Sequence, residues 1–180
     1  MPRFKRTAHR VSLTAMFASM SLLFLVLASV LPTARAAMYF LSSIFVMGLV
    51  LEEEIGLAFM MFAVVSALSL LFIAPRSLIV IPYVLFFGHY GIGKYYIETN
   101  IRDKVVRYIV KLLYYNVALI LIFLIAQAAS QSTFSNLVGF NISLWILVPL
   151  AEVAFVLYDF LFTKVTAYYF NHIRRKLMKD

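Results

Sequence analysis

The chain has 180 residues, of which 64% are apolar and 13% charged, with a net charge of +8 and no cysteine. A soluble fold of this length cannot hide so much apolar surface, so the composition argues against a soluble enzyme and favours a membrane protein. Because cysteine is absent, disulfides, thiol nucleophiles and thiolate metal sites are excluded.

Uncharged apolar runs follow one another along the chain and predict an all-α integral membrane protein. A spanning helix needs about 20 apolar residues, and the second run is short enough to be tilted or partly interfacial. The longest polar connections are 98–107 and 130–139. We expect one domain over residues 1–180, with six transmembrane helices at 11–31, 36–51, 56–74, 78–96, 108–129 and 141–170.

The first apolar run has two interpretations. Ala34-Arg35-Ala36 resembles the cleavage site of a signal peptide. The run from Val11 to Leu31 is 21 residues long, however, whereas the apolar core of a signal peptide has about 7–15 residues. Because further apolar segments follow, we expect a first helix that is retained.

Basic residues are distributed unevenly between the two predicted sides of the membrane. With the amino terminus in the cytoplasm and six spans, 14 of the 16 bases fall in the inner segments, and only Arg35 and Arg76 fall outside. The positive-inside rule therefore predicts a multi-pass protein of a bacterial-type plasma membrane with both termini cytoplasmic. The bases flank helices and no Gly-rich phosphate loop is present, so nucleic-acid binding is not expected.

Polar side chains within the spans are candidates for function, because they are costly in lipid. His89, Asn116 and Glu152 each lie about nine to twelve residues into the fourth, fifth and sixth spans, near the middle of the bilayer. If these helices adjoin, the three side chains face one cavity. They then either bind a solute or form a structural network between helices.

A second candidate group lies at the predicted outer edge. Arg35 and Arg76 either clamp an anionic solute or contact lipid headgroups. Tyr39, Tyr83 and Trp145 either belong to the interfacial aromatic belt or stack on a flat ring at the mouth of a cavity.

Small residues in the first helix form a third feature. Ala15 and Ser19 are four residues apart, as are Thr14 and Ala18. This spacing allows close helix approach, either within the chain or to another subunit. Elsewhere, residues 52–54 (three glutamates) either cap a helix or dock a basic partner, and Asp159 is placed to reach Lys94 or Lys111.

No arrangement for catalysis appears in the sequence. No nucleophile neighbours a base, no pair of acids is placed for acid–base work, and no histidine has a metal-ligand partner at helical spacing. ATP-binding motifs are also absent. We therefore expect neither an enzyme nor a cofactor or metal, and any active transport needs energy from another subunit.

Together these features resemble the S component, the substrate-binding subunit, of energy-coupling factor (ECF) vitamin importers. The resemblance rests on the six-helix topology with both termini inside and on the first-helix run TAMFASMSLLFLVLASVLP, in which Ala15-x-x-x-Ser19 stands where the family usually has two alanines. Residues 74–98, APRSLIVIPYVLFFGHYGIGKYYIE, also look like the third turn and fourth helix of such proteins. A signature for riboflavin, thiamine, biotin or folate is not recognisable.

The resemblance implies an outward-open pocket between the first and third outer turns and the outer halves of helices four to six. Its projected lining is Arg35, Tyr39, Arg76, Tyr83, His89, Asn116, Trp145 and Glu152. Ala15, Ala18 and Ser19 would dock on a transmembrane coupling subunit that works with two ATPases. Two alternatives stay open: a non-transporting membrane scaffold or accessory subunit that binds lipid or another helix bundle, and a self-sufficient carrier or channel formed by oligomers.

Overall fold

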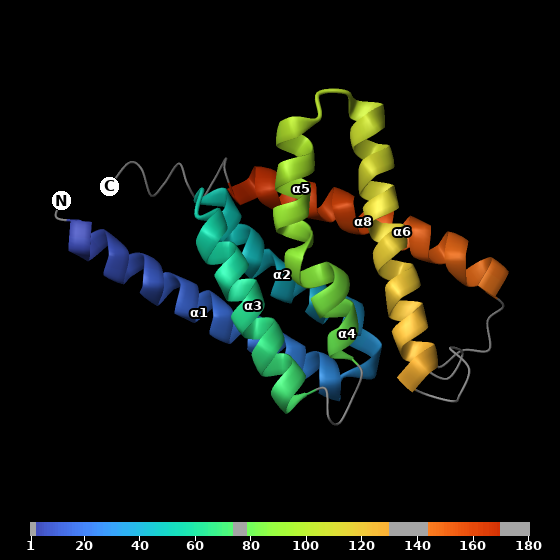
Figure 1. Ribbon diagram of the computed structural model, residues 1–180, viewed down its shortest axis with the longest axis horizontal. Helices are drawn as coiled ribbons and strands as arrows, with labels where there is room; N and C mark the ends of the chain where they lie inside the picture. The colour runs from blue at the N-terminus through green and yellow to red at the C-terminus, as the bar shows by residue number, and fades with distance from the viewer. Residues whose placement is uncertain (1–2, 74–78, 130–143, 170–180) are drawn as a thin grey trace. The chain divides into compact units, whose positions relative to one another are not determined.

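The computed structural model describes residues 3–73, 79–129 and 144–169, and every regular element in these ranges is helical (Figure 1). The predicted all-α class is confirmed. The elements are α1 (Arg3–Val30), the short 3₁₀ turn η1 (Pro32–Ala34), α2 (Arg35–Leu51), α3 (Ile55–Phe72), α4 (Val80–Pro82), the π-helical turn η2 (Tyr83–Phe87), α5 (Gly88–Asn100), α6 (Lys104–Ala129) and α8 (Leu144–Tyr168).

Three helices in the described ranges are long and apolar enough to cross a membrane. They are the segments Arg10–Val30, Ile55–Phe72 and Lys104–Ile125, and Arg35–Leu51 is a shorter apolar helix. These helices indicate a membrane protein. Six spans and cytoplasmic termini stay predictions.

The connection before α6 is shorter than the predicted polar loop at 98–107. Helix α5 continues to Asn100 and α6 begins at Lys104. The carboxylate of Asp103 accepts a hydrogen bond from the backbone N–H of Val105 at 2.8 Å and so caps α6. The polar residues of this region therefore belong to the end of α5 and the start of α6. The sequence pattern alone did not reveal this.

The chain divides into two compact units, Met1–Ala129 and Ser130–Asp180. In the second unit the structure describes α8, which contains Pro149. Two threonine hydroxyls of α8 donate to carbonyls one turn earlier, Thr163 to Asp159 and Thr166 to Phe162. Such local bonds satisfy hydroxyl groups on an apolar helix.

Consecutive helices of the first unit run in alternating directions (Figure 1). The end of α1, the start of α2, the end of α3 and the start of α4 therefore lie at one end, which we call the Arg35 end. The connection from α2 to α3 and the turn from α5 to α6 lie at the other end. An ion pair of 2.8 Å between Arg10 and Glu54 holds the first part of α1 at that second end.

Several small residues belong to the interior of the first unit. Ser21, Ala28, Ser42, Ala58 and Ser69 are fully buried. Small side chains let helices approach closely in a membrane, where packing rather than hydrophobic burial drives association. Larger apolar side chains fill the spaces between them, among them Leu25, Val46, Leu49, Met61, Val65, Val80 and Phe86.

Candidate functional site

One face of α2 carries polar residues from the Arg35 end into the interior. Arg35, Tyr39 and Ser42 follow one another at spacings of four and three residues, so they lie on the same side of the helix. Tyr39 and Ser42 are buried, and Arg35 is partly buried. We call these three residues the α2 polar stripe.

Ser42 joins the stripe to a buried group of hydroxyls. Its Oγ lies 2.6 Å from the Oγ of Ser21 on α1 and donates to the Ser21 carbonyl at 3.0 Å. The hydroxyl of Tyr83, at the start of η2, lies 3.3 Å from the same Ser21 Oγ. Three helical segments are therefore bonded through side chains at one buried point, where unmade bonds would be costly.

Tyr83 reaches this point from a turn of π-helix that directly follows Pro82. Proline has no N–H to donate, so it disturbs the regular helical bonding around it. π-Helical turns are rare and frequently occur at functional sites. Gly88 directly follows the turn and begins α5. A methyl group at this glycine would lie 2.7 Å from the ring of Phe62 and 2.9 Å from that of Tyr83. The absence of a side chain there lets both rings pack against the backbone.

Tyr39 also contacts the start of the fourth helical segment. Its hydroxyl donates to the Ile79 carbonyl at 2.6 Å, and its ring stacks on that of Phe87 at 5.1 Å between centroids. The aromatic side chains predicted as an outer belt are thus partly interior: Tyr39 is 7% exposed and Tyr83 is fully buried.

Arg35 is the one residue of the stripe with an unsatisfied buried atom. Among the residues that the structure describes, its buried Nε has no hydrogen-bond partner, and no side chain caps the start of α2. A guanidinium group recognises planar anions such as carboxylate through several N–H donors. The positive end of the α2 dipole at the same place also favours a negative charge.

His89 forms a second polar contact in the interior of the first unit. Its Nδ1 is hydrogen-bonded to the hydroxyl of Tyr114 on α6, and the edge of its ring packs against Phe62 on α3 at 5.2 Å between centroids. The bond joins α5 to α6 in the middle of the predicted spans. The bond either stabilises the packing of α5 against α6 or forms part of the polar wall of a solute site.

Of the remaining predicted lining residues, one lies on α6, two lie in the second unit and one lies outside the described residues. Asn116 is partly buried and donates to the Leu112 carbonyl on its own helix at 3.0 Å. Glu152 and Trp145 lie on α8 in the second unit, and Arg76 lies outside the described residues. Convergence of His89, Asn116 and Glu152 therefore stays a prediction.

Three residues of the interior network were not predicted from the sequence. Ser21 continues the spacing of Thr14 and Ala18 by three residues, which places it on the same face of α1. Ser42 continues the spacing of Arg35 and Tyr39. No sequence spacing singled out Tyr114. It bonds to a residue of another helix, and such a pairing depends on tertiary packing.

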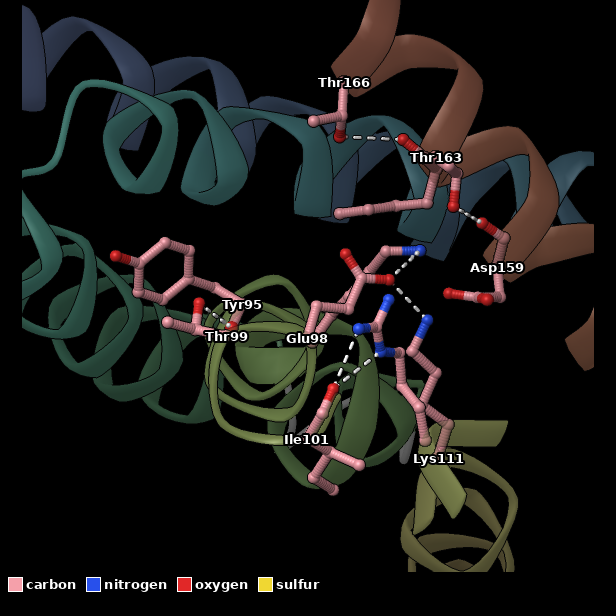
Figure 2. Close-up of polar contacts among 11 residues, drawn as sticks. Tyr95, Glu98, Thr99, Ile101, Lys111, Asp159, Thr163 and Thr166 are labelled. Atoms are coloured by element: carbon pink, nitrogen blue, oxygen red, sulfur yellow. Dashed lines mark hydrogen bonds and ion pairs between the residues drawn. The ribbon is translucent and has the colours of Figure 1, made fainter. Parts of the chain in front are cut away.

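A separate charged cluster lies between α5 and α6. One carboxylate oxygen of Glu98 contacts the ammonium of Lys111 at 2.6 Å and that of Lys94 at 3.6 Å (Figure 2). Both lysines are buried, at 4% and 1% exposure. Because buried charges need partners, this cluster fixes the pairing of the two helices.

The small residues proposed for docking differ in exposure. Ala15 and Ser19 are exposed on α1, whereas Ala18 is partly buried. The hydroxyl of Ser19 donates to the Ala15 carbonyl at 2.9 Å, so it is satisfied within its own helix. Exposed apolar residues flank the pair, including Met16, Met20 and Leu23.

Within the residues that the structure describes, no group of three or more His, Asp or Glu side chains is placed to hold a metal ion. No protein-family model, curated protein or solved structure matches the chain.

Proposed function

We propose that this chain is the substrate-binding subunit of an ECF-type importer. It captures a small, anionic, vitamin-like solute from outside the cell and delivers it together with a transmembrane coupling subunit and two ATPase subunits. The buried Arg35 Nε, which has no hydrogen-bond partner in the described part of the chain, is the observation that carries this proposal. A buried guanidinium N–H without an acceptor is costly in an apolar protein, and an anionic ligand would satisfy it.

The surroundings of Arg35 support a ligand that also has a flat apolar part. Tyr39 lies one turn further along α2, and its ring stacks on Phe87. Aromatic faces suit the rings of vitamin-like solutes. In this proposal the anionic group binds Arg35, with Arg76 as a second base, and the ring lies against Tyr39. Tyr83 and His89, which make polar contacts within the first unit, continue the proposed lining. Asn116, Trp145 and Glu152 stay lining residues predicted from the sequence.

The arrangement of bases in the first unit supports an orientation with the Arg35 end outside. Arg10, Arg102 and Lys104 belong to the opposite end, as do Arg107 and the buried pair of lysines. Bases are enriched on the cytoplasmic side of bacterial-type membranes. A solute that meets Arg35 would then arrive from outside, and with six spans both termini are cytoplasmic.

Ligand binding is expected to raise the unfolding temperature of the purified chain and to depend on Arg35. A panel of water-soluble vitamins and their precursors, including biotin, folate, riboflavin and thiamine, is added in a thermal-shift assay in detergent. Arg35→Gln is expected to weaken the binding of an anionic hit about 10- to 100-fold, the usual value of hydrogen bonds to charged groups.

Lys164→Gln is a matched control for that assay, because it removes an exposed base from α8. It should leave the affinity unchanged. If every vitamin leaves the unfolding temperature unchanged, solute capture is wrong. If a vitamin binds equally well to Arg35→Gln, the binding site lies elsewhere.

Ala15 and Ser19 are the proposed contact with the coupling subunit, beside the partly buried Ala18. Replacing both exposed residues by leucine is expected to reduce co-purification with an ECF coupling subunit and two ATPases by at least tenfold, because bulk prevents close helix approach. Ala63→Leu with Ala67→Leu is the control, since both alanines are exposed and four residues apart on α3. Equal losses in the two pairs, or no loss in either, would contradict the docking face.

A non-transporting membrane scaffold is the second candidate. This function is favoured by the hydrogen bonds that the hydroxyl of Tyr83 and the Nδ1 of His89 make with other side chains of the chain. A scaffold needs such internal bonds but no solute. The thermal-shift panel separates the two functions, because a scaffold responds to a partner helix bundle or to lipid and to none of the vitamins.

A further inference from the structure

The turn from α5 to α6 presents two cations to the surroundings. Arg102 and Lys104 flank Asp103 and are both exposed. Arg102 precedes and Lys104 begins the segment Lys104–Ile125, which is long and apolar enough to cross a membrane, so a bilayer crossed by this segment would have its headgroups at this turn. This tip is a distinct feature of the first unit and takes no part in the α2 polar stripe.

The other charged groups of the turn are engaged in holding its shape. The guanidinium of Arg107 donates to the Ile101 carbonyl from two nitrogens, at 2.8 and 3.3 Å (Figure 2). Asp103 caps α6 through the Val105 N–H, and Glu98 bridges two buried lysines. The two exposed cations therefore stand on a turn that is ordered by its neighbours, which lowers the entropy cost of binding an anion.

An apolar surface begins immediately beside these cations. Val105, Ile109 and Leu113 are 67%, 54% and 59% exposed, and they follow one another at spacings of four residues along α6. Tyr96 on α5 and Tyr108 on α6 are also exposed, each one turn from the end of its helix. Tyrosines at this depth typically mark the membrane interface. A ligand of the whole surface must therefore combine an anionic head with an apolar chain.

We propose that this turn is a binding site for an anionic phospholipid. The phosphate lies between Arg102 and Lys104, the interfacial tyrosines flank the headgroup, and an acyl chain runs along the exposed stripe of α6. The adjoining apolar stripe favours a lipid over a soluble phosphate or an acidic peptide, neither of which would cover Val105 and Ile109. The site does not depend on solute capture and applies equally to a scaffold.

Native mass spectrometry of the full chain from nanodiscs of mixed phosphatidylglycerol and phosphatidylcholine tests the site. The chain is expected to retain phosphatidylglycerol in preference to phosphatidylcholine. A base near a membrane surface contributes about fivefold to binding, so Arg102→Gln with Lys104→Gln is expected to reduce the retained phosphatidylglycerol roughly 25-fold. Arg102→Lys with Lys104→Arg should keep most of the binding, because both charges remain.

Matched single variants separate a local site from overall charge. Lys104→Gln should reduce lipid retention, whereas Lys164→Gln removes the same kind of exposed base and should not. The unfolding temperature of each variant is measured in phosphatidylcholine alone to establish that it is folded. Equal retention by Lys104→Gln and Lys164→Gln would overturn the proposal. Displacement of the lipid by soluble glycerol phosphate would also overturn it, since the site would then recognise a free phosphate.

Discussion

Replacement of Gly88 by alanine is expected to destabilise the chain by about 1–3 kcal/mol, the usual cost of overpacking a filled core. The added methyl would lie 2.7 Å from the Phe62 ring and 2.9 Å from the Tyr83 ring, so both rings would have to move. Movement of Tyr83 would also lengthen its contact with Ser21. The midpoint of unfolding, followed by circular dichroism during titration of detergent micelles with sodium dodecyl sulfate, measures this loss.

Gly56 supplies a control of the same chemistry. A methyl group at Gly56 meets no atom within 4 Å. Gly56→Ala should therefore be neutral or should stabilise the chain by up to about 1 kcal/mol, because alanine forms helix more readily than glycine. If the two alanine variants unfold at the same midpoint, the close packing of Phe62 and Tyr83 over Gly88 is wrong.

Replacement of Glu98 by glutamine is expected to cost about 1–3 kcal/mol, the usual loss when a buried donor loses its acceptor; the two lysines are buried, whereas the side chain of Glu98 is 36% exposed. The change removes the carboxylate that contacts the ammonium groups of Lys94 and Lys111. Glutamine keeps the size of the side chain, so the loss reports on charge rather than on packing. The same unfolding titration measures the effect.

Two further variants test whether charge is the cause. Arg102→Gln removes an exposed charge from the turn between α5 and α6 and should change stability in detergent by less than about 0.5 kcal/mol. Glu98→Gln combined with Lys111→Met removes both charges of the shorter contact and should recover part of the lost stability. A double variant that is no more stable than Glu98→Gln would show that the carboxylate acts in another way.

Much of the helical organisation could be predicted from the sequence. The long apolar runs, together with Pro32 and the charged residues at 52–54, placed the first three helices within a few residues of their observed ends, apart from the extension of α1 back to Arg3. This success has a simple physical basis, because a helix that faces lipid must be apolar along its whole length and must satisfy its backbone internally. Interruptions of such a run by charge or proline are then visible without any tertiary information.

Prediction of the turn from α5 to α6 and of the π-helical turn was less complete. Residues 98–107 are polar and were expected to form a loop, yet Arg107 and Asp103 use their side chains to cap helix ends. Likewise, Pro82 and Gly88 were visible as helix-disturbing residues, but the sequence does not say that the five residues between them form a π-helical turn. Both outcomes depend on which backbone groups the side chains can reach.

The candidate site shows the same division at the level of single residues. The distribution of charge along the sequence placed Arg35 among the few bases outside the main basic segments. Helical spacing alone puts Tyr39 and Ser42 on the same face of α2 as Arg35. Only the packed helices decided that Ser42 meets Ser21 and Tyr83, and that His89 bonds to Tyr114. The apolar runs specify that each helix forms, because lipid exposure acts on every segment separately. The choice of partner between helices is made by close packing and hydrogen bonding, which act only once the segments are assembled.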